Sequence, residues 1–188
     1  GKWIENLTDT STVWNHQWRA HGSQPGYGVK QSSQFLISKS TDDGLTWSEP
    51  RNITRQVKKE KWWLLAPGPG RGITMEDGTL VFPVEGRNED GLQFSTIMWS
   101  KDKGENWTVG EPAYYNTNEC QVVELSDHSL MLNMRERSNR GRQEGNGRAI
   151  AVTADLGKTW TEHPTSRRAL IEPACQASLL RHDYIEDG

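Results

Sequence analysis

The sequence has little of what marks a disulfide-rich, metal-binding or membrane-spanning protein. It has two cysteines, Cys120 and Cys175, which are too few for a disulfide framework, and neither they nor the five histidines stand at metal-ligand spacings. No apolar run approaches the roughly 18 residues that a transmembrane helix requires. We therefore expect no metal, no cofactor and no membrane span in this chain.

The chain also has a small net charge and few hydrophobic residues. The net charge of −3 gives no electrostatic reason to expect nucleic acid or an anionic membrane as a partner. Hydrophobic residues make up only 33% of the chain, yet it contains 9 Trp, so aromatic rings are expected to supply much of the core. No signal peptide is visible, and the chain opens on Gly1-Lys2-Trp3 without Met, so the natural N-terminus is expected upstream.

One turn motif, by contrast, occurs three times in the sequence. Ser/Thr-x-Asp-x-Gly-x-x-Trp, the Asp box, occurs at residues 40–47, 100–107 and 153–160, with starts 60 and then 53 residues apart. An Asp side chain can accept hydrogen bonds from amides of its own turn, and Gly can adopt the positive φ that such a turn needs. Because an apolar stretch precedes each copy, each predicts a strand, a tight turn and a second strand. The residue that ends each copy is expected to be largely buried: Trp47, Trp107 and Trp160.

A second repeat is offset from the Asp boxes. Residues 70–82 align with residues 120–132 at an offset of 50, and residues 120–125 align with residues 175–180 at an offset of 55. Together with the Asp-box hairpin, each unit has four antiparallel strands in about 50–60 residues, which is typical of a β-propeller blade. Parallel β-solenoid repeats are shorter, and an immunoglobulin-like sandwich does not repeat one turn at this spacing.

The predicted fold is therefore all-β, a β-propeller of four-stranded antiparallel blades. A stack of blades without a closed ring would expose sheet faces and strand edges. We therefore expect an incomplete central fragment of a propeller, with the rest of the ring supplied by flanking polypeptide or by a second chain. The predicted divisions are a loop and the end of one blade in residues 1–65, whole blades in 66–112 and 118–165, and the start of another blade in 173–188.

Three connecting segments each lead to a separate structural prediction. Trp14, Trp18 and Tyr27 lie in a loop rich in Gly, Ser and Asn, where the rings either form the floor of a sugar site or pack the end of a sheet. The charged connection at residues 56–61 is expected to face solvent. Residues 64–73 contain two Pro and three Gly, so this backbone can approach a ligand closely, but no Gly-Lys-Ser/Thr ending supports a phosphate loop.

Candidate functional residues follow from the propeller architecture, in which the first strand of each blade lines the central axis. The residues where these strands begin are Arg71, Glu119 with Gln121, and Gln176. Arg135 follows a nearly apolar run, where an Arg is expected only if it is paired or if its head reaches a pocket. A carboxylate and a guanidinium near one mouth of the axis would suit an acidic substrate, with the Arg clamping a carboxylate. The alternative is a structural Arg–Glu pair that ties two strands together.

The chain resembles the exo-α-sialidases (neuraminidases). The resemblance rests on the three Asp boxes together with residues 118–125 and 132–135, and it extends to residues 68–73 and 172–178. It is greatest to the secreted enzymes of gut bacteria of the Bacteroidetes type. It implies a six-bladed propeller, sialylated glycans or glycoproteins as partners, and a secreted, periplasmic or cell-surface location (lysosomal for an animal protein).

The resemblance also implies roles for particular residues. A sialidase uses a neutral Tyr as nucleophile, since the substrate carries a carboxylate at its anomeric carbon that would repel an anionic one. Glu119 matches the carboxylate that activates this Tyr, and Arg135 matches the second member of the Arg triad that holds the substrate carboxylate. Gln176 matches a pocket position near the glycerol side chain of sialic acid, and Arg71 lies in a loop at the pocket edge.

The other members of the catalytic set have no match in the chain. The first Arg of the triad and the Asp acid/base are expected before residue 1, and the third Arg and the Tyr after residue 188. Tyr114, Tyr115 and Tyr184 do not match the place of the nucleophile. The chain alone is therefore expected to be inactive.

Three alternatives stay open. A non-enzymatic Asp-box propeller that binds a protein or peptide would need the boxes but neither Glu119 nor Arg135. A sialic-acid lectin module would need Arg135 but no Tyr. A trans-sialidase, including an intramolecular one, would use the same residues as a hydrolase.

Overall fold

The computed structural model divides the chain into two compact units. The first comprises Gly1–Ala66 and Gly86–Leu92, and the second comprises Pro67–Glu85 and Gln93–Gly188. The described residues are 23–28, 32–139, 141, 144–172 and 174–182. Three aromatic residues considered above lie outside them: Trp14, Trp18 and Tyr184.

The first unit holds the first Asp box between two short strands. β1 (Leu36–Ile37) pairs antiparallel with β2 (Arg51–Asn52), so the box joins the two strands of a hairpin. A four-residue helix, α3 (Thr54–Val57), follows β2. Strand β3 (Leu64–Pro67) then begins beside the chain segment around Arg87, whose carbonyl accepts the amide of the residue before β3 at 2.9 Å.

Part of the charged connection at residues 56–61 faces inward, so the prediction that it faces solvent is wrong there. Val57 and Lys58 are buried, and Lys58 Nζ donates to the Gly26 carbonyl at 2.7 Å. Burial lowers the pKa of Lys58 to about 8. The physical reason is that the aliphatic stem of a Lys can be buried when its amine finds a carbonyl acceptor.

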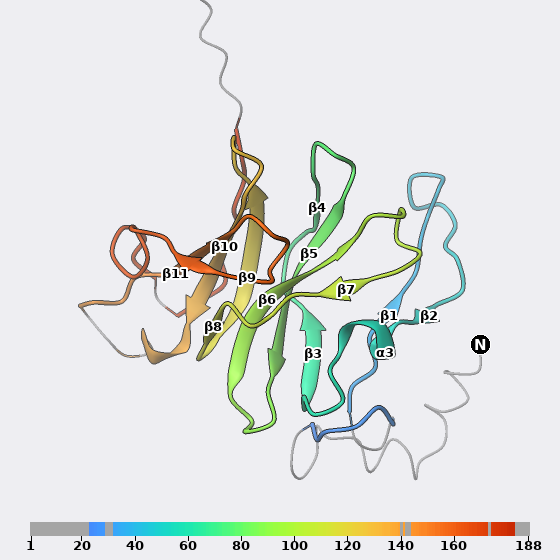
Figure 1. Ribbon diagram of the computed structural model, residues 1–188, viewed down its shortest axis with the longest axis horizontal. Coiled ribbons are helices and arrows are strands. Elements are labelled where there is room, and N and C mark those ends of the chain that lie inside the picture. Colours follow the sequence, from blue (N-terminus) through green and yellow to red (C-terminus); the bar gives the residue numbers. More distant parts are fainter. Residues whose placement is uncertain (1–22, 29–31, 140, 142–143, 173, 183–188) are drawn as a thin grey trace, which may run out of the picture. The chain divides into compact units, whose positions relative to one another are not determined.

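Most of the strands belong to the second unit (Figure 1). β5 (Leu80–Arg87), which ends in the first unit, pairs with β6 (Gln93–Ser100), and β6 pairs in turn with β7. Two further short strands flank this hairpin, with β4 on β5 and β8 on β6. The bounds of the short strands are Ile73–Thr74 for β4, Thr108–Val109 for β7 and Tyr114–Tyr115 for β8.

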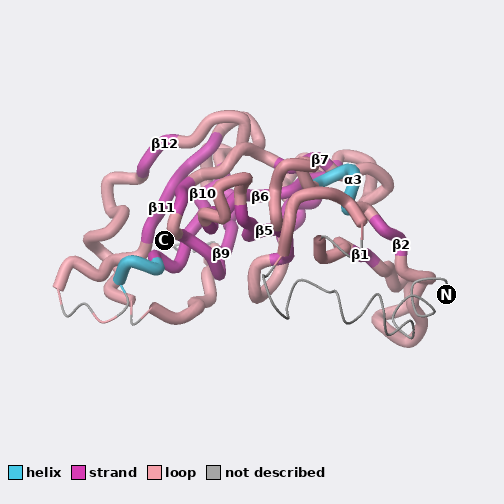
Figure 2. The backbone as a smooth tube through the Cα atoms, turned by 90° about the horizontal axis from the view of Figure 1, so that it is seen from below, coloured by secondary structure: helices cyan, strands magenta, loops and turns pink. Residues whose placement is uncertain are grey.

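The second sheet of this unit has four antiparallel strands that follow one another in chain order, β9-β10-β11-β12. β9 (Thr117–Glu124) and β10 (Leu130–Glu136) form a long hairpin, and β11 (Ala149–Thr153) and β12 (Thr161–Glu162) flank the third Asp box. A 3-10 turn follows β10 at Arg137–Asn139. In the described part of the chain, helix is confined to short segments (Figure 2), and none is long and apolar enough to cross a membrane.

Buried apolar side chains from both sheets of the second unit form one cluster. Its members are Met75, Val81, Ile97, Cys120, Val122, Leu130, Leu132, Met134, Ala149 and Ala151. The cluster itself contains no aromatic ring, and Trp99, Tyr114 and Trp160 pack at its edge. Aromatic rings are buried elsewhere in the described residues, where Trp62 and Phe94 are among the largest fully buried side chains. The cluster fixes β9 against β6 as well as against its hairpin partner β10.

The three Asp boxes share the predicted turn. In each, the hydroxyl at the first position accepts the amide N–H of the Gly, at 2.8 Å in the first copy and 2.9 Å in the other two. The Asp accepts the amide of the residue four positions later at 2.9, 2.8 and 2.9 Å. The Gly residues have φ angles of 88°, 89° and 80°, so the predicted positive φ is confirmed: Gly44, Gly104 and Gly157.

The prediction that all three box Trp residues are largely buried is wrong for Trp47. Trp107 is only 4% exposed and meets the Phe82 ring edge-on, with centroids 5.5 Å apart. Trp160 is half-buried, and its indole N–H donates to the carbonyl of Glu111 in the preceding hairpin at 2.9 Å. Trp47 is 64% exposed, because no described residue covers its ring. Its indole N–H donates to the Gly44 carbonyl at 3.1 Å, a bond within the turn that the buried Trp107 also makes.

Candidate functional site

Glu119 and Arg135 meet across the β9–β10 hairpin. Arg135 Nη1 lies 3.0 Å from Glu119 Oε1, and the side chains are 20% and 30% exposed respectively. The pair stands at the open end of the hairpin, because Glu119 is near the start of β9 and Arg135 is near the end of β10. The structure thus brings the two candidate residues together, and the contact by itself fits both a substrate clamp and a structural tie.

The backbone at Glu119 is strained. Its φ of 43° lies in the left-handed region, which a residue with a Cβ adopts at a cost of about 1–3 kcal/mol. The register of the hairpin shifts at the same place, where two residues of β9 oppose one residue of β10. The flanking pairs are Asn133 with Gln121 and Arg135 with Asn118. A β-bulge re-aims the side chain that it carries, and here that side chain is the carboxylate that meets Arg135.

A second carboxylate, that of Glu85, contacts the backbone of Glu119. Glu85, in β5, accepts the Glu119 amide N–H through Oε2 at 2.7 Å. Burial raises the pKa of Glu85; the hydrogen bond from the Glu119 amide opposes this, and the charge of Glu119 adds to it. Glu85 was not predicted from the sequence, although a carboxylate directly after the apolar run at residues 80–84 was a usable signal.

Arg148 and Glu172 form a buried ion pair beside these strands. Arg148 Nη1 lies 2.9 Å from Glu172 Oε2, and the side chains are 4% and 1% exposed. Arg148 also donates to the carbonyls of Cys175, at 2.9 Å, and Glu119, at 3.4 Å, and to the side chain of Asn133. Burial lowers the pKa of Arg148, and Glu172 opposes that effect. Neither residue of this pair was predicted from the sequence.

Of the other two candidate residues, Gln176 lies near the Glu119–Arg135 pair and Arg71 lies away from it. Gln176 is exposed, and its neighbour Cys175 is tied through Arg148 to the Glu119 backbone, so the Gln176 segment lies beside the pair. Arg71 is exposed and lines a pocket of about 260 Å³ together with the end of β9, away from Glu119. The other residues of that pocket are Ile73, Thr74, Glu76, Val123, Glu124, Leu180 and Arg181.

The Gly- and Pro-rich loop before β4 packs against β9. The Pro69 carbonyl accepts a hydrogen bond from the side chain of Gln121, which is buried. A Cβ atom at Gly68 would lie 2.8 Å from the Cys120 carbonyl, so only Gly permits this approach. The close backbone approach that the sequence predicted is therefore made to a neighbouring strand.

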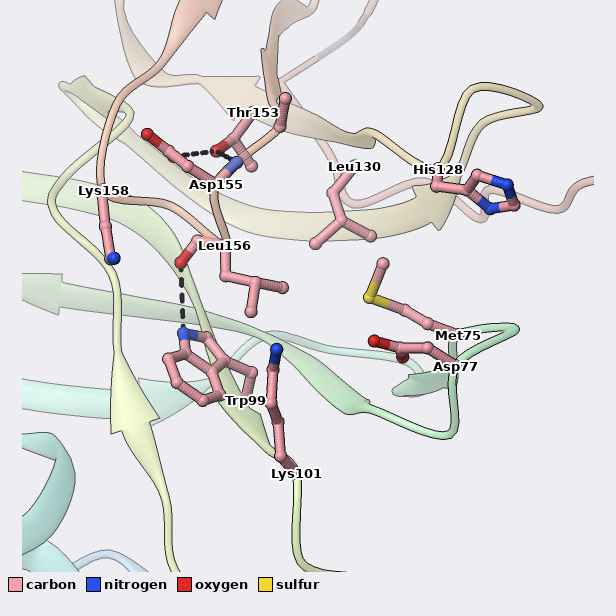
Figure 3. Close-up of a pocket in the computed structure, with 11 residues that line it drawn as sticks. Met75, Asp77, Trp99, Lys101, His128, Leu130, Thr153, Asp155, Leu156 and Lys158 are labelled. Carbon is pink, nitrogen blue, oxygen red and sulfur yellow. Dashed lines mark hydrogen bonds between the residues drawn. The ribbon is translucent and has the colours of Figure 1, made fainter.

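A larger pocket lies at the other end of the β9–β10 hairpin (Figure 3). Its volume is about 430 Å³, and its lining comes from the turn of this hairpin, the turn between β4 and β5, the end of β6 with the residue after it, and the third Asp box. Lys101 and Lys158 contribute positive charge, while Asp77 and Asp155 contribute negative charge, so no sign dominates. No group of three or more potential metal ligands occurs in the described residues. The Glu119–Arg135 pair therefore remains the candidate site.

Comparison with known proteins identifies the family. The family model of the BNR repeat-like domain matches residues 10–184. The sialidase of Bacteroides fragilis (strain YCH46) is 49% identical over 182 residues, which cover 92% of this chain and 32% of that protein. The sialidase of Clostridium perfringens is 34% identical over 180 residues, covering 87% of this chain and 45% of that protein. The chain therefore spans less than half the length of these relatives.

Solved structures show the same likeness. The Hadza microbial sialidase Hz136 has a TM-score of 0.76 at 46% identity, covering 84% of this chain and 31% of that one. Trypanosoma rangeli sialidase in complex with sialic acid has a TM-score of 0.54 at 26% identity, covering 69% of this chain and 21% of that one. These neighbours are β-propellers, so the predicted all-β propeller class and the resemblance to sialidases are confirmed. Because the family model matches nearly the whole sequence, this chain belongs to the BNR repeat-like domain family.

Proposed function

We propose that the complete protein is a retaining exo-α-sialidase, which releases terminal sialic acid from sialylated glycans or glycoproteins. The observation that carries the proposal is the Glu119–Arg135 contact at 3.0 Å on a bulged strand. An anionic sugar needs a cation to hold its carboxylate, and its hydrolysis needs a base, and this pair offers both. The similarity to proteins named sialidase, at up to 49% identity among those described above, supports the same reaction.

In the proposed reaction a Tyr of the complete protein attacks the anomeric carbon, and Glu119 accepts the phenolic proton. The bond to the leaving-group oxygen breaks as an Asp of the complete protein protonates that oxygen, and water later releases the sugar from the Tyr. Arg135 would hold the sugar carboxylate with two further Arg side chains. The Glu119 contact engages Arg135 Nη1, which leaves other N–H donors of the guanidinium for the substrate.

The remaining assignments belong to the same proposal. Gln176 would lie near the glycerol side chain of sialic acid, and Arg71 would belong to a loop at the pocket edge. The rest of the propeller, on the same polypeptide or on a second chain, would complete the site. We also propose a secreted, periplasmic or cell-surface location.

The test is hydrolysis of a fluorogenic α-sialoside by the complete protein and its Glu119→Gln variant. We expect release by the wild type and a fall in kcat of about 100-fold or more in the variant, the size of effect expected for loss of a general base. Binding of the sialoside without release would indicate a lectin instead. No binding and no release would indicate a non-enzymatic propeller, and transfer of sialic acid to an acceptor would identify a trans-sialidase.

A further inference from the structure

Glu85 is a half-buried carboxylate beside the candidate site for which the proposed reaction has no use. Its Oε2 lies 2.7 Å from the Glu119 amide nitrogen, and the residues are 34 apart in sequence. Even partial burial disfavours the charged form of a carboxylate, so a partly buried Glu is expected to have a charged or hydrogen-bonding partner. The hydrogen-bonding partner here is a backbone N–H, so this bond acts on the backbone conformation of Glu119.

The Glu119 amide needs an acceptor from outside its own hairpin. At a β-bulge the extra residue is left out of the ladder, and the hairpin register does shift at Glu119. A φ of 43° at a residue with a Cβ is retained only where surrounding contacts hold it. A carboxylate that accepts a backbone N–H makes a charge-assisted bond, which is stronger than a neutral one and therefore suited to that task.

The direction in which Glu119 points depends on the bulge. Without the bulge, side chains of β9 would alternate strictly between the two faces of the sheet, and a one-residue slip would send Glu119 to the other face. With the bulge, the Glu119 carboxylate reaches Arg135 Nη1 at 3.0 Å. The Glu85 bond and the Arg135 contact therefore hold the backbone and the side chain of the same residue.

We infer that Glu85 is a positioning residue, which fixes the bulge that aims the Glu119 carboxylate in the sialidase reaction. The inference rests on the proposed function, because it assigns the purpose of the bulge to that reaction. A positioning residue should affect turnover more than substrate binding, because Glu119 acts on the nucleophile whereas Arg135 holds the substrate carboxylate.

The test compares Glu85→Leu, which removes the acceptor, with Glu85→Gln, which keeps an acceptor oxygen at the same reach. Each is made in the complete protein, and kcat and KM are measured with a fluorogenic α-sialoside. We expect Glu85→Leu to lower kcat by about 10- to 100-fold with little change in KM, and Glu85→Gln to restore most of kcat. The control is Asp127→Ala, which removes a carboxylate that accepts the Ser129 amide at 3.0 Å in the turn at the far end of the hairpin. It should leave kcat unchanged.

A second measurement does not depend on activity. Hydrogen exchange of the Glu119 amide, resolved by NMR, should be slow in the wild type and in Glu85→Gln and faster in Glu85→Leu. If Glu85→Leu does not fold, Glu85→Asp serves instead, since its shorter side chain withdraws the acceptor and should lower kcat in the same way. Wild-type kcat or unchanged amide exchange in the variant that lacks the acceptor would overturn the inference. A wild-type protein without sialidase activity would refute the proposed function, and the exchange data would then decide separately whether Glu85 holds the bulge.

Discussion

The indole N–H of Trp99, in β6, donates to the carbonyl of Leu156 at 3.1 Å, which joins one Asp-box hairpin to the next (Figure 3). A second indole bond, from Trp160 to the Glu111 carbonyl at 2.9 Å, runs between the same hairpins in the opposite direction along the chain. Between them the Glu111 amide donates to the Gly157 carbonyl at 2.8 Å. The Asp-box turn therefore does more than close its own hairpin, because it presents carbonyls and an indole to its neighbour.

Trp99→Phe should lower the free energy of unfolding by about 0.5–1.5 kcal/mol, because a ring stays in place while the Leu156 carbonyl loses its donor. Urea denaturation followed by circular dichroism measures the change. Trp47→Phe is the matched control, since Trp47 is 64% exposed and its indole bonds within its own turn. An equal loss in both variants would contradict the idea that these indole bonds join hairpins.

The Asp boxes should make stability depend on pH at acid values. Hydrogen bonds from the residue four positions later lower the pKa of three carboxylates from the ordinary value of 3.8 to about 2: Asp42, Asp102 and Asp155. A carboxylate with a lowered folded-state pKa contributes stability that is present above about pH 4 and is lost as the pH falls through about 2. Urea midpoints measured from pH 5 to pH 2 should therefore fall, and Asp102→Asn should flatten that fall. An unchanged slope in the variant would refute this origin.

The Asp-box turns could be predicted because the hydrogen bonds that close them lie within the eight-residue motif, as from the Gly104 amide to Ser100 or from the Asn106 amide to Asp102. The exposure of Trp47 could not be predicted in the same way. A box Trp is buried only where a segment outside its own turn offers it a surface, as Phe82 in β5 does for Trp107. That surface depends on the packing of hairpins, which the turn motif does not contain.

The residues of the candidate site were likewise predicted from the sequence only in part. Glu119 and Arg135 could be predicted from their places on predicted strands and from a family resemblance, and the structure does place them in contact. Glu85 and Arg148 were missed, because their partners lie 34 and 24 residues away in sequence. Those contacts depend on strand register and on a bulge, and neither follows from local residue patterns.

The buried Arg148–Glu172 pair should matter strongly for stability. Arg148→Met alone should lower the free energy of unfolding by about 3–5 kcal/mol, because it leaves Glu172 charged and buried without its cation. Combining it with Glu172→Gln should recover part of that loss, since the amide can still accept the bonds that Glu172 takes from the Glu136 amide and the Asn139 side chain. A double-mutant cycle by urea denaturation measures the coupling. Simple additivity of the two changes would show that the pair is not coupled.

The two cysteines should differ sharply in reactivity. Burial raises the pKa of Cys120 to about 12, and the residue is fully buried, whereas Cys175 is exposed. Because the thiolate is the reactive form, iodoacetamide should label Cys175 in the folded protein and Cys120 only after denaturation. Peptide mass spectrometry before and after addition of urea distinguishes the two sites. Rapid labelling of Cys120 in the native protein would show that this part of the core opens readily.

The Arg135→Lys variant distinguishes two roles of Arg135: supplying a positive charge, and binding a carboxylate through two parallel hydrogen bonds. A Lys keeps a positive charge near Glu119 but cannot present the planar pair of donors that grips a carboxylate through both oxygens. If Arg135 clamps the substrate, kcat/KM for a fluorogenic α-sialoside should fall by about 10- to 100-fold in the complete protein, which corresponds to about 1.4–2.7 kcal/mol. Arg137→Lys is the matched control, because Arg137 is exposed two residues further along the chain. A structural tie between strands needs only the charge, so normal kinetics in Arg135→Lys would assign the Glu119–Arg135 pair to folding and remove Arg135 from the substrate site.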